Sequence, residues 1–138
     1  MNTQKFLFAV SICLFTFACS SDDDNGNQQQ ESNEDLLVSG KWYFESKTPG
    51  SYSDCEKSGY IQFRSDGTFT IEVYEDNGGT CESLGADNGN YTLTNNVNIT
   101  LTAGSETQSA VITSISQSEL KITNSGDGEM LVFDKTAG

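Results

Sequence analysis

The side chains that could do chemistry in this chain are its 4 cysteines and 20 carboxylates, because no histidine is present. General acid–base or nucleophilic catalysis needs a positioned base with a partner, and histidine most often supplies that base. Glu72 and Glu75 are expected on opposite faces of one strand, whereas Asp76, Glu82 and Asp87 lie in segments predicted to be turns. A carboxylate in a turn is more often a turn former than a catalyst. The sequence therefore predicts no catalytic residue and no enzyme.

Metal and phosphate sites are also not indicated. The segments ADNGN and NSGDGE have the composition of calcium loops, but neither has the ligand spacing or the terminal bidentate Glu of such a loop. No Gly-rich phosphate loop joins a strand to a helix. The cysteines have no close spacing and no histidine to complete a metal site. We expect no metal and no cofactor.

The N-terminal segment has the composition of an export signal. Lys5 precedes an apolar run without charge, from Phe6 to Ala18. These roughly thirteen residues are too few to span a bilayer, which needs about twenty. Residues 1–18 are therefore predicted to be a signal peptide, with Cys19 as the first residue of the mature chain.

Cys19 and its neighbours resemble the processing site of bacterial lipoproteins. The sequence TFAC (residues 16–19) is similar to the lipobox, with Thr16 in place of the usual Leu. The resemblance implies lipidation of Cys19 by several fatty acyl chains such as palmitate, and more than one chain is needed for stable anchoring. The sequence SSDDD (residues 20–24) resembles the acidic tether of Bacteroidetes-type lipoproteins that face outward from the outer membrane. We expect a lipid-anchored outer-membrane protein at the cell surface; the alternatives are a periplasm-facing position and soluble secretion after cleavage near Ala18.

Residues 19–35 are predicted to form a lipidated, disordered, acidic tether. Residues 20–35 contain no aromatic or aliphatic side chain, so they cannot bury enough apolar surface to offset the entropy of ordering. Residues 36–138 have the size of one domain. The formal net charge of −13 and the lack of clustered Lys and Arg argue against nucleic acid as a partner.

Cys55 and Cys81 are the two cysteines of the predicted domain. In an exported protein two such thiols are expected to form a disulfide. The strand pattern places them at the same end of the sheet but two strand spacings apart, about 9–10 Å. A disulfide needs Cα atoms within about 7 Å. Cys55 must therefore fold over the rim of the sheet.

Apolar and polar residues alternate through residues 36–138, as is typical of half-buried strands. In the clearest run, residues 68–75, Phe69, Ile71 and Val73 share one face. No segment shows a helical period. Turn residues connect the runs, at Asp66-Gly67, at Asn95-Asn96 and in the segments EDNGG, ADNGN and SGDGE. The pattern predicts an all-β meander of about eight or nine antiparallel strands, closed as an up-and-down barrel or packed as a sandwich.

The residues expected to point inward are bulky and apolar. They are Trp42, Phe44, Ile61, Phe63, Phe69, Ile71, Val73, Tyr91, Leu93, Val97, Ile99, Leu101, Ile112, Leu120 and Ile122. An eight-stranded barrel is either filled by such side chains or holds one small ligand, and this bulk favours a filled interior. The candidate lining of a pocket is Trp42, Phe44, Phe63, Phe69, Ile71, Tyr91, Leu93, Ile99 and Leu101. The register of the last strand is not set by the pattern, because both of its faces are apolar.

Four stretches resemble, in order and spacing, the lipocalin-like domains of bacterial lipoproteins. They are residues 36–44 (LLVSGKWYF), 59–70, 89–102 and 112–123. Gly40, Lys41 and Trp42 fill the Gly-x-Trp motif of the first strand, and Lys135 is the nearest candidate for the basic residue that stacks on that Trp. The resemblance implies a calycin-type up-and-down barrel of about eight strands. We expect a non-enzymatic monomer that binds a small apolar ligand; the alternative is a solid barrel that acts through its surface, as an envelope interaction module or a protease inhibitor.

Overall fold

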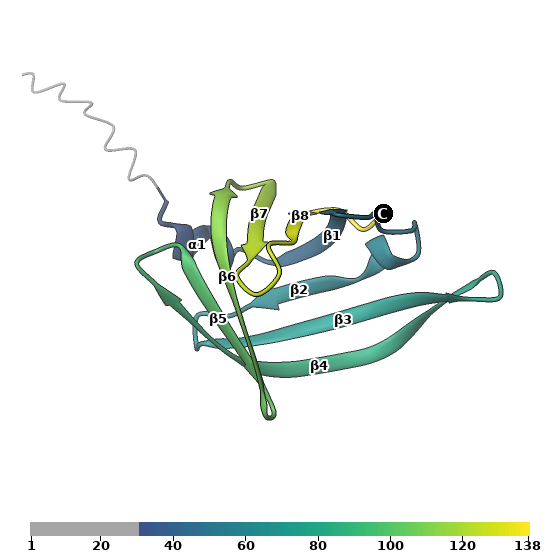
Figure 1. The fold of residues 1–138 in the computed structure, drawn as a ribbon, viewed down its shortest axis with the longest axis horizontal. Helices are drawn as coiled ribbons and strands as arrows, with labels where there is room; N and C mark the ends of the chain where they lie inside the picture. Colours follow the sequence, from purple (N-terminus) through teal and green to yellow (C-terminus); the bar gives the residue numbers. More distant parts are fainter. Residues whose placement is uncertain (1–30) are drawn as a thin grey trace, which may run out of the picture.

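The computed structural model describes residues 31–138. The predicted signal peptide, Cys19 and most of the predicted tether therefore lie outside the described residues. Within residues 31–138, eight antiparallel strands form a closed barrel in which each strand pairs with the next and β8 returns to β1 (Figure 1). The prediction of an all-β, up-and-down, lipocalin-like barrel is confirmed.

The elements follow one another in simple order. The strands are β1 (Lys41–Thr48), β2 (Tyr60–Phe63), β3 (Thr68–Asn77), β4 (Thr80–Thr94), β5 (Asn98–Ala103), β6 (Glu106–Ile115), β7 (Glu119–Asn124) and β8 (Met130–Asp134). Two short helices in the same residues, α1 (Asn33–Leu37) and η1 (Glu56–Ser58), precede β1 and β2. None of the helices in residues 31–138 has the length and apolar content required to cross a lipid bilayer.

Helix α1 covers one end of the barrel, which we name the closed end; the opposite end is the open end. The Ser32 hydroxyl accepts a hydrogen bond from the Asp35 backbone N–H, and the Asp35 carboxylate accepts one from the Ser32 backbone N–H. This capping box begins a helix whose Leu36 and Leu37 are buried. The structure differs here from the sequence-based expectation, because the helix begins at Asn33, inside the segment predicted as a tether. A helix of five residues is too short to show a period in the sequence.

The closed half of the barrel is filled by its own side chains. Trp42 and Leu37 are fully buried, and the Trp42 indole N–H donates a hydrogen bond of 2.9 Å to the Leu37 carbonyl. The ring of Phe63 packs edge-on against that of Tyr91, with centroids 5.0 Å apart. These contacts place the densest part of the core directly beneath α1.

Strand β4 continues through a segment predicted to be a turn. Residues 86–90, the ADNGN segment, pair without interruption with residues 68–72 of β3. Gly89 is required there by close approach, since a Cβ atom would lie 2.6 Å from the ring of Phe69. The turn prediction is therefore wrong, and Asp87 is a strand residue. Asp76 and Glu82, also predicted in turns, lie within β3 and β4.

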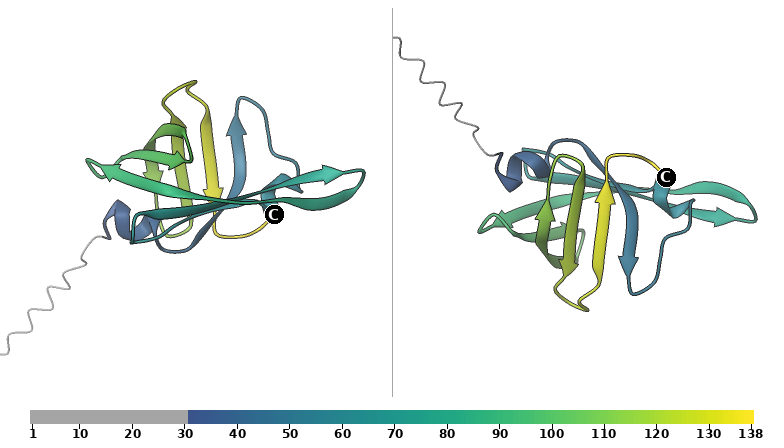
Figure 2. Two further views of the ribbon diagram at one scale, coloured as in Figure 1. Left: turned by 90° about the horizontal axis from the view of Figure 1, so that it is seen from below. Right: turned by 90° about the horizontal axis from the view of Figure 1, so that it is seen from above.

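A β-bulge in β4 lies opposite Val73. Leu84 and Gly85 of β4 together oppose Val73 alone, because the register shifts between Glu72 and Tyr74. A bulge inserts one residue and changes the direction in which neighbouring side chains point. Val73 also lies just beyond Glu72, the last residue of β3 that pairs with β2, and it is 40% exposed, which corrects its predicted buried position. Beyond the bulge the β3–β4 hairpin extends past the rest of the barrel, on the side away from α1 (Figure 2).

The short turns and the last strand have defined geometry. Asn95 and Asn96 both have positive φ, as the sequence predicts for this turn. At the other predicted tight turn, Gly67 has a positive φ and Asp66 does not. The Asp66 carboxylate accepts a hydrogen bond from the Thr68 backbone N–H. In β8 the ambiguous register is settled by Phe133, which is buried.

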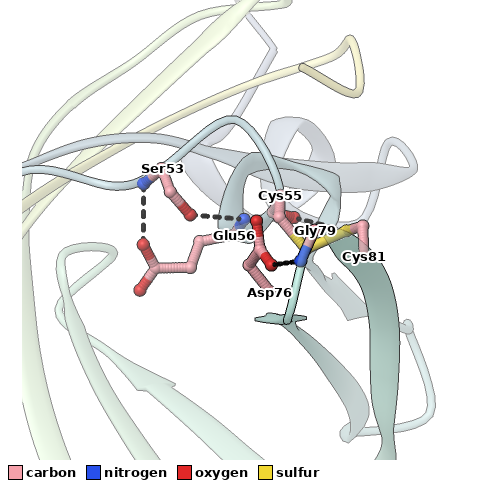
Figure 3. The surroundings of a disulfide bond; sticks show 6 residues. All are labelled: Ser53, Cys55, Glu56, Asp76, Gly79 and Cys81. Atoms are coloured by element: carbon pink, nitrogen blue, oxygen red, sulfur yellow. Dashed lines mark hydrogen bonds between the residues drawn. A yellow bond between two sulfur atoms is a disulfide. The ribbon is translucent and has the colours of Figure 1, made fainter.

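The disulfide between Cys55 and Cys81 is present, with a Cα–Cα distance of 5.4 Å. Cys55 directly precedes η1, which lies against β1 and β3, so the loop crosses the rim as predicted. Hydrogen bonds hold the flanking loops, with the Ser53 backbone N–H donating to the Glu56 carboxylate at 2.7 Å (Figure 3). Residues 31–138 thus close their own sheet, bury their own core and carry their own cross-link, and contain what one domain needs to fold alone.

Candidate ligand-binding cavity

The open half of the barrel is hollow. Its outer cavity, of about 470 Å³, lies at the end opposite α1, where the turn between β5 and β6 forms part of its wall. The lining residues are Phe69, Ile71, Asp87, Asn88, Leu101, Ala103, Gly104, Glu106 and Gln108. A filled interior was the favoured expectation; it describes the closed half and not the open half.

A smaller inner cavity, of about 100 Å³, adjoins the outer one. Ile71, Leu101 and Gln108 line both cavities, so they mark where the two meet. The other residues that line the inner cavity are Phe44, Ile61, Ser109, Ala110, Ile122, Asn124, Leu131 and Phe133. The inner wall is therefore mostly aromatic and aliphatic.

Strand register explains why the outer cavity combines apolar and acidic residues. Paired residues on neighbouring strands project to the same face of a sheet. Ile71 pairs with Asp87, and Ala103 pairs with Glu106. Each carboxylate therefore shares the interior face with an apolar neighbour, and both line the outer cavity.

The nine candidate pocket residues divide into two groups. Phe44, Phe69, Ile71 and Leu101 line one or both cavities. Five line neither cavity. They are Trp42, Phe63, Tyr91 and Ile99, which are buried in the closed-end core, and Leu93, which packs against that core. All nine lie in the barrel. Whether one of them lines a cavity depends on how far along the barrel axis it lies from the closed end.

Several lining residues were not among the candidates. The polar and small residues Asp87, Ala103, Glu106 and Gln108 border the outer cavity, and Phe133 borders the inner one. Alternation carries a signal for some of them, because Ala103 follows Leu101, and Gln108 precedes Ala110, at a spacing of two. A search restricted to large apolar residues could not identify Asp87, Ala103, Glu106 and Gln108, and Phe133 was missed because the alternation does not set the register of the last strand.

Lys135 occupies the place expected for the basic partner of the first-strand Trp. Its Nζ lies 3.3 Å from the centroid of the Trp42 ring and donates a hydrogen bond of 2.9 Å to the Ser39 hydroxyl. Burial lowers the pKa of Lys135 from its ordinary value of 10.5. The contact lies at the closed end, away from both cavities.

Tyr52, in the β1–β2 loop, packs on Phe44, which lines the inner cavity. Its ring packs on Phe44 with centroids 5.1 Å apart, and the Lys47 Nζ lies 4.6 Å from the same ring. Burial, together with the carboxylates of Glu129 and Glu56, raises the pKa of Tyr52 to about 12. The phenol is therefore neutral at physiological pH, which suits its contact with an apolar wall.

Metal binding was also considered in the described part of the chain. Within residues 31–138 no three side chains of His, Cys, Asp or Glu come together as a potential metal site. The chemistry that the cavities offer is therefore contact with apolar surface, hydrogen bonding by amide and hydroxyl groups, and the negative charge of two carboxylates.

Comparison with known proteins identifies a family, and the similar solved structures include a bacterial and a bovine protein. The family model of the lipocalin-like domain matches residues 38–122. A crystal structure of a lipocalin-like protein from Bacteroides uniformis is 17% identical, with a TM-score of 0.54, over 72% of this chain and 99% of that one. The bovine lipocalin allergen Bos d 2 is 15% identical, with a TM-score of 0.43, over 74% of this chain and 75% of that one. No curated protein matches the sequence.

Proposed function

The chain belongs to the lipocalin-like domain family, and from this premise we propose that it is a non-enzymatic binding protein, anchored by lipid in the outer membrane, whose barrel holds one small, mainly apolar molecule. The observation that carries the proposal is the hollow open half of the barrel. Ligand pockets in proteins commonly have volumes of about 300–1,000 Å³ with mostly apolar walls and a few polar groups. The outer cavity of about 470 Å³, extended by the inner one, has this size and composition.

The division of the barrel also supports binding over a purely structural role. The closed end is packed around Trp42, whereas the open half leaves Leu101 and Ile71 bordering empty space. Leaving apolar side chains without packing partners forgoes dispersion contacts that a filled barrel would make. A bound apolar molecule would restore those contacts, and this favours the ligand-binding proposal over a solid barrel acting only through its surface.

Titration with a neutral apolar probe tests the binding proposal. Residues 20–138 would be purified and titrated with N-phenyl-1-naphthylamine, whose fluorescence increases in an apolar environment. We expect saturable binding with one probe per chain, because of the two cavities the outer one, of about 470 Å³, has room for the probe and the inner one, of about 100 Å³, is much smaller. Fluorescence that rises linearly without saturation, or no rise at all, would contradict the proposal.

The membrane anchor is proposed from the sequence, since Cys19 follows an apolar segment and precedes a polar one. The chain would be expressed in a Bacteroidetes host supplied with an alkyne-labelled palmitate. We expect label on the wild-type protein and on Cys13→Ser, and none on Cys19→Ser, because the acylated thiol is that of the mature N-terminus. Protease treatment of intact cells then reports orientation, with degradation of the barrel expected for surface display. Equal labelling of Cys19→Ser would exclude the anchor.

A further inference from the structure

We infer that the molecule held in the barrel is a cationic amphiphile, with an apolar body and an amine or similar positive group. This inference rests on the proposed function and adds the charge of the ligand to it. The apolar body would occupy the region bordered by Ile71 and Leu101, which line both cavities. The positive group would lie near Asp87 and Glu106, which line only the outer cavity.

The two carboxylates face the same cavity from different strands. Asp87 lies on β4 and pairs with Ile71, while Glu106 begins β6 and pairs with Ala103. Both side chains therefore project to the interior face alongside apolar neighbours. A cation held in this cavity would be attracted by both carboxylates, and an anion would be repelled by both.

The basic side chains of residues 31–138 are all engaged elsewhere. Lys57 and Lys121 form ion pairs with Glu45 and Glu119, Arg64 donates to the Thr70 hydroxyl, and Lys41, Lys47 and Lys135 lie over the rings of Tyr60, Tyr52 and Trp42. None of these six lines the outer or the inner cavity. In this part of the chain no positive charge offsets Asp87 and Glu106 from within the cavity.

The other polar groups of the outer cavity do not favour one sign of ligand charge. Asn88 pairs with Thr70 on the opposite face of the sheet from Asp87, and its side-chain oxygen accepts a hydrogen bond from the Thr70 hydroxyl. The side-chain amide of Gln108 contains both donors and an acceptor, so it serves an amine and a carboxylate equally well. The preference for a positively charged ligand therefore comes from the carboxylates of Asp87 and Glu106 alone. A fatty acid would bring a third negative charge to this cavity, whereas an alkyl amine would bring the opposite one.

Three ligands with the same ten-carbon chain separate this inference from the proposed function. Decylammonium, decanol and decanoate would each displace the naphthylamine probe from residues 20–138, at pH 7, at low ionic strength and below their micelle concentrations. We expect decylammonium to bind about fivefold more tightly than decanol, and decanoate about fivefold more weakly, as exposed ion pairs contribute. In about 1 M salt, where the Debye length is about 3 Å, the differences should fall below about twofold.

Matched variants locate the effect. In the double variant Asp87→Asn, Glu106→Gln we expect the three affinities to lie within about twofold of one another. The control Glu34→Gln, Glu75→Gln removes the same two charges at positions that line neither cavity, and should keep the wild-type order. If decanol binds but the wild type ranks decanoate equal to or above decylammonium, the inference fails while the proposed function stands. If none of the three ligands displaces a probe that itself binds saturably, the inference fails and the proposed function stands; if the probe does not bind, both fail.

Discussion

Trp42 joins three parts of the molecule at the closed end. Its ring is fully buried, its indole N–H donates to the Leu37 carbonyl of α1, and its face contacts Lys135 beyond β8. A cation over an indole ring adds about 0.5–2 kcal/mol, depending on how far the pair is removed from water. A single side chain thus fixes the helix and the C-terminal segment onto the first strand.

Trp42→Phe should therefore destabilise the barrel. The smaller ring leaves a cavity and removes the donor that satisfies the buried Leu37 carbonyl, so we expect the free energy of unfolding to fall by about 2–3 kcal/mol. Urea denaturation followed by circular dichroism measures this change. Tyr43→Phe, at the adjacent and partly exposed position, is the control and should change the value by less than about 0.5 kcal/mol. A loss below about 1 kcal/mol for Trp42→Phe would show that the closed end does not depend on this residue.

The β3–β4 hairpin is the element that depends most on the disulfide. Beyond the bulge at Val73 its two strands pair only with each other, from Tyr74–Ser83 to Asn77–Thr80. A two-stranded ribbon without a packed face is at best marginally stable in water. The Cys55–Cys81 bond connects this arm to η1, so it stabilises an element that lacks a core of its own.

Removal of the disulfide should have a measurable cost. The linked cysteines are separated by 26 residues, and closing a loop of that length contributes roughly 3.5 kcal/mol in the chain-entropy model. We expect Cys55→Ala, Cys81→Ala to lower the free energy of unfolding by about 3 kcal/mol in urea denaturation. Reductant should produce the same loss in the wild type and none in the variant. Equal stability of the oxidised wild type and the variant would refute this account.

The strands that a sequence can predict are those with one exposed face and no interruption. The run of β3 up to Ile71, the turn at Asn95 and Asn96 and the pairing of the cysteines all follow from alternation, turn chemistry and export. The exposure of Val73 does not, because it depends on where β3 loses its partner β2, after Glu72. The strand conformation of residues 86–90 also does not follow from these signals. Gly89 is there because the ring of Phe69 leaves no room for a Cβ atom, and not because the chain turns.

The candidate site was predictable only in part, because the sequence pattern shows which side chains point inward but not where each lies along the barrel. Alternation identifies which side chains point inward, and it correctly places Phe44 and Leu101 on the interior face. It does not give the position of each residue along the barrel axis, which depends on strand tilt and stagger. That position decides whether an inward residue meets the packed closed end, as Tyr91 does, or the hollow open half.

At the scale of the whole molecule, the barrel has its packed core at one end and its cavities towards the other. The buried cluster around Trp42 and α1 supplies the core, and the outer and inner cavities lie towards the other end. The chain is strongly acidic, with a formal net charge of −13, which favours solubility and the approach of positively charged molecules. This separation means that the open half can be altered without removing the core that holds the barrel together.

The most direct test of this account compares two tryptophan substitutions on β5 in the naphthylamine titration. Ala103→Trp places a large ring in the wall of the outer cavity, whereas Thr102→Trp places it on the exposed outer face one residue earlier. We predict that Ala103→Trp weakens probe binding by about tenfold or more, because one methyl-sized wall group is replaced by a ring that fills the cavity. Thr102→Trp should bind within about twofold of the wild type. Equal probe affinities for the two variants, with both folded by circular dichroism, would contradict the claim that the ligand lies inside the barrel.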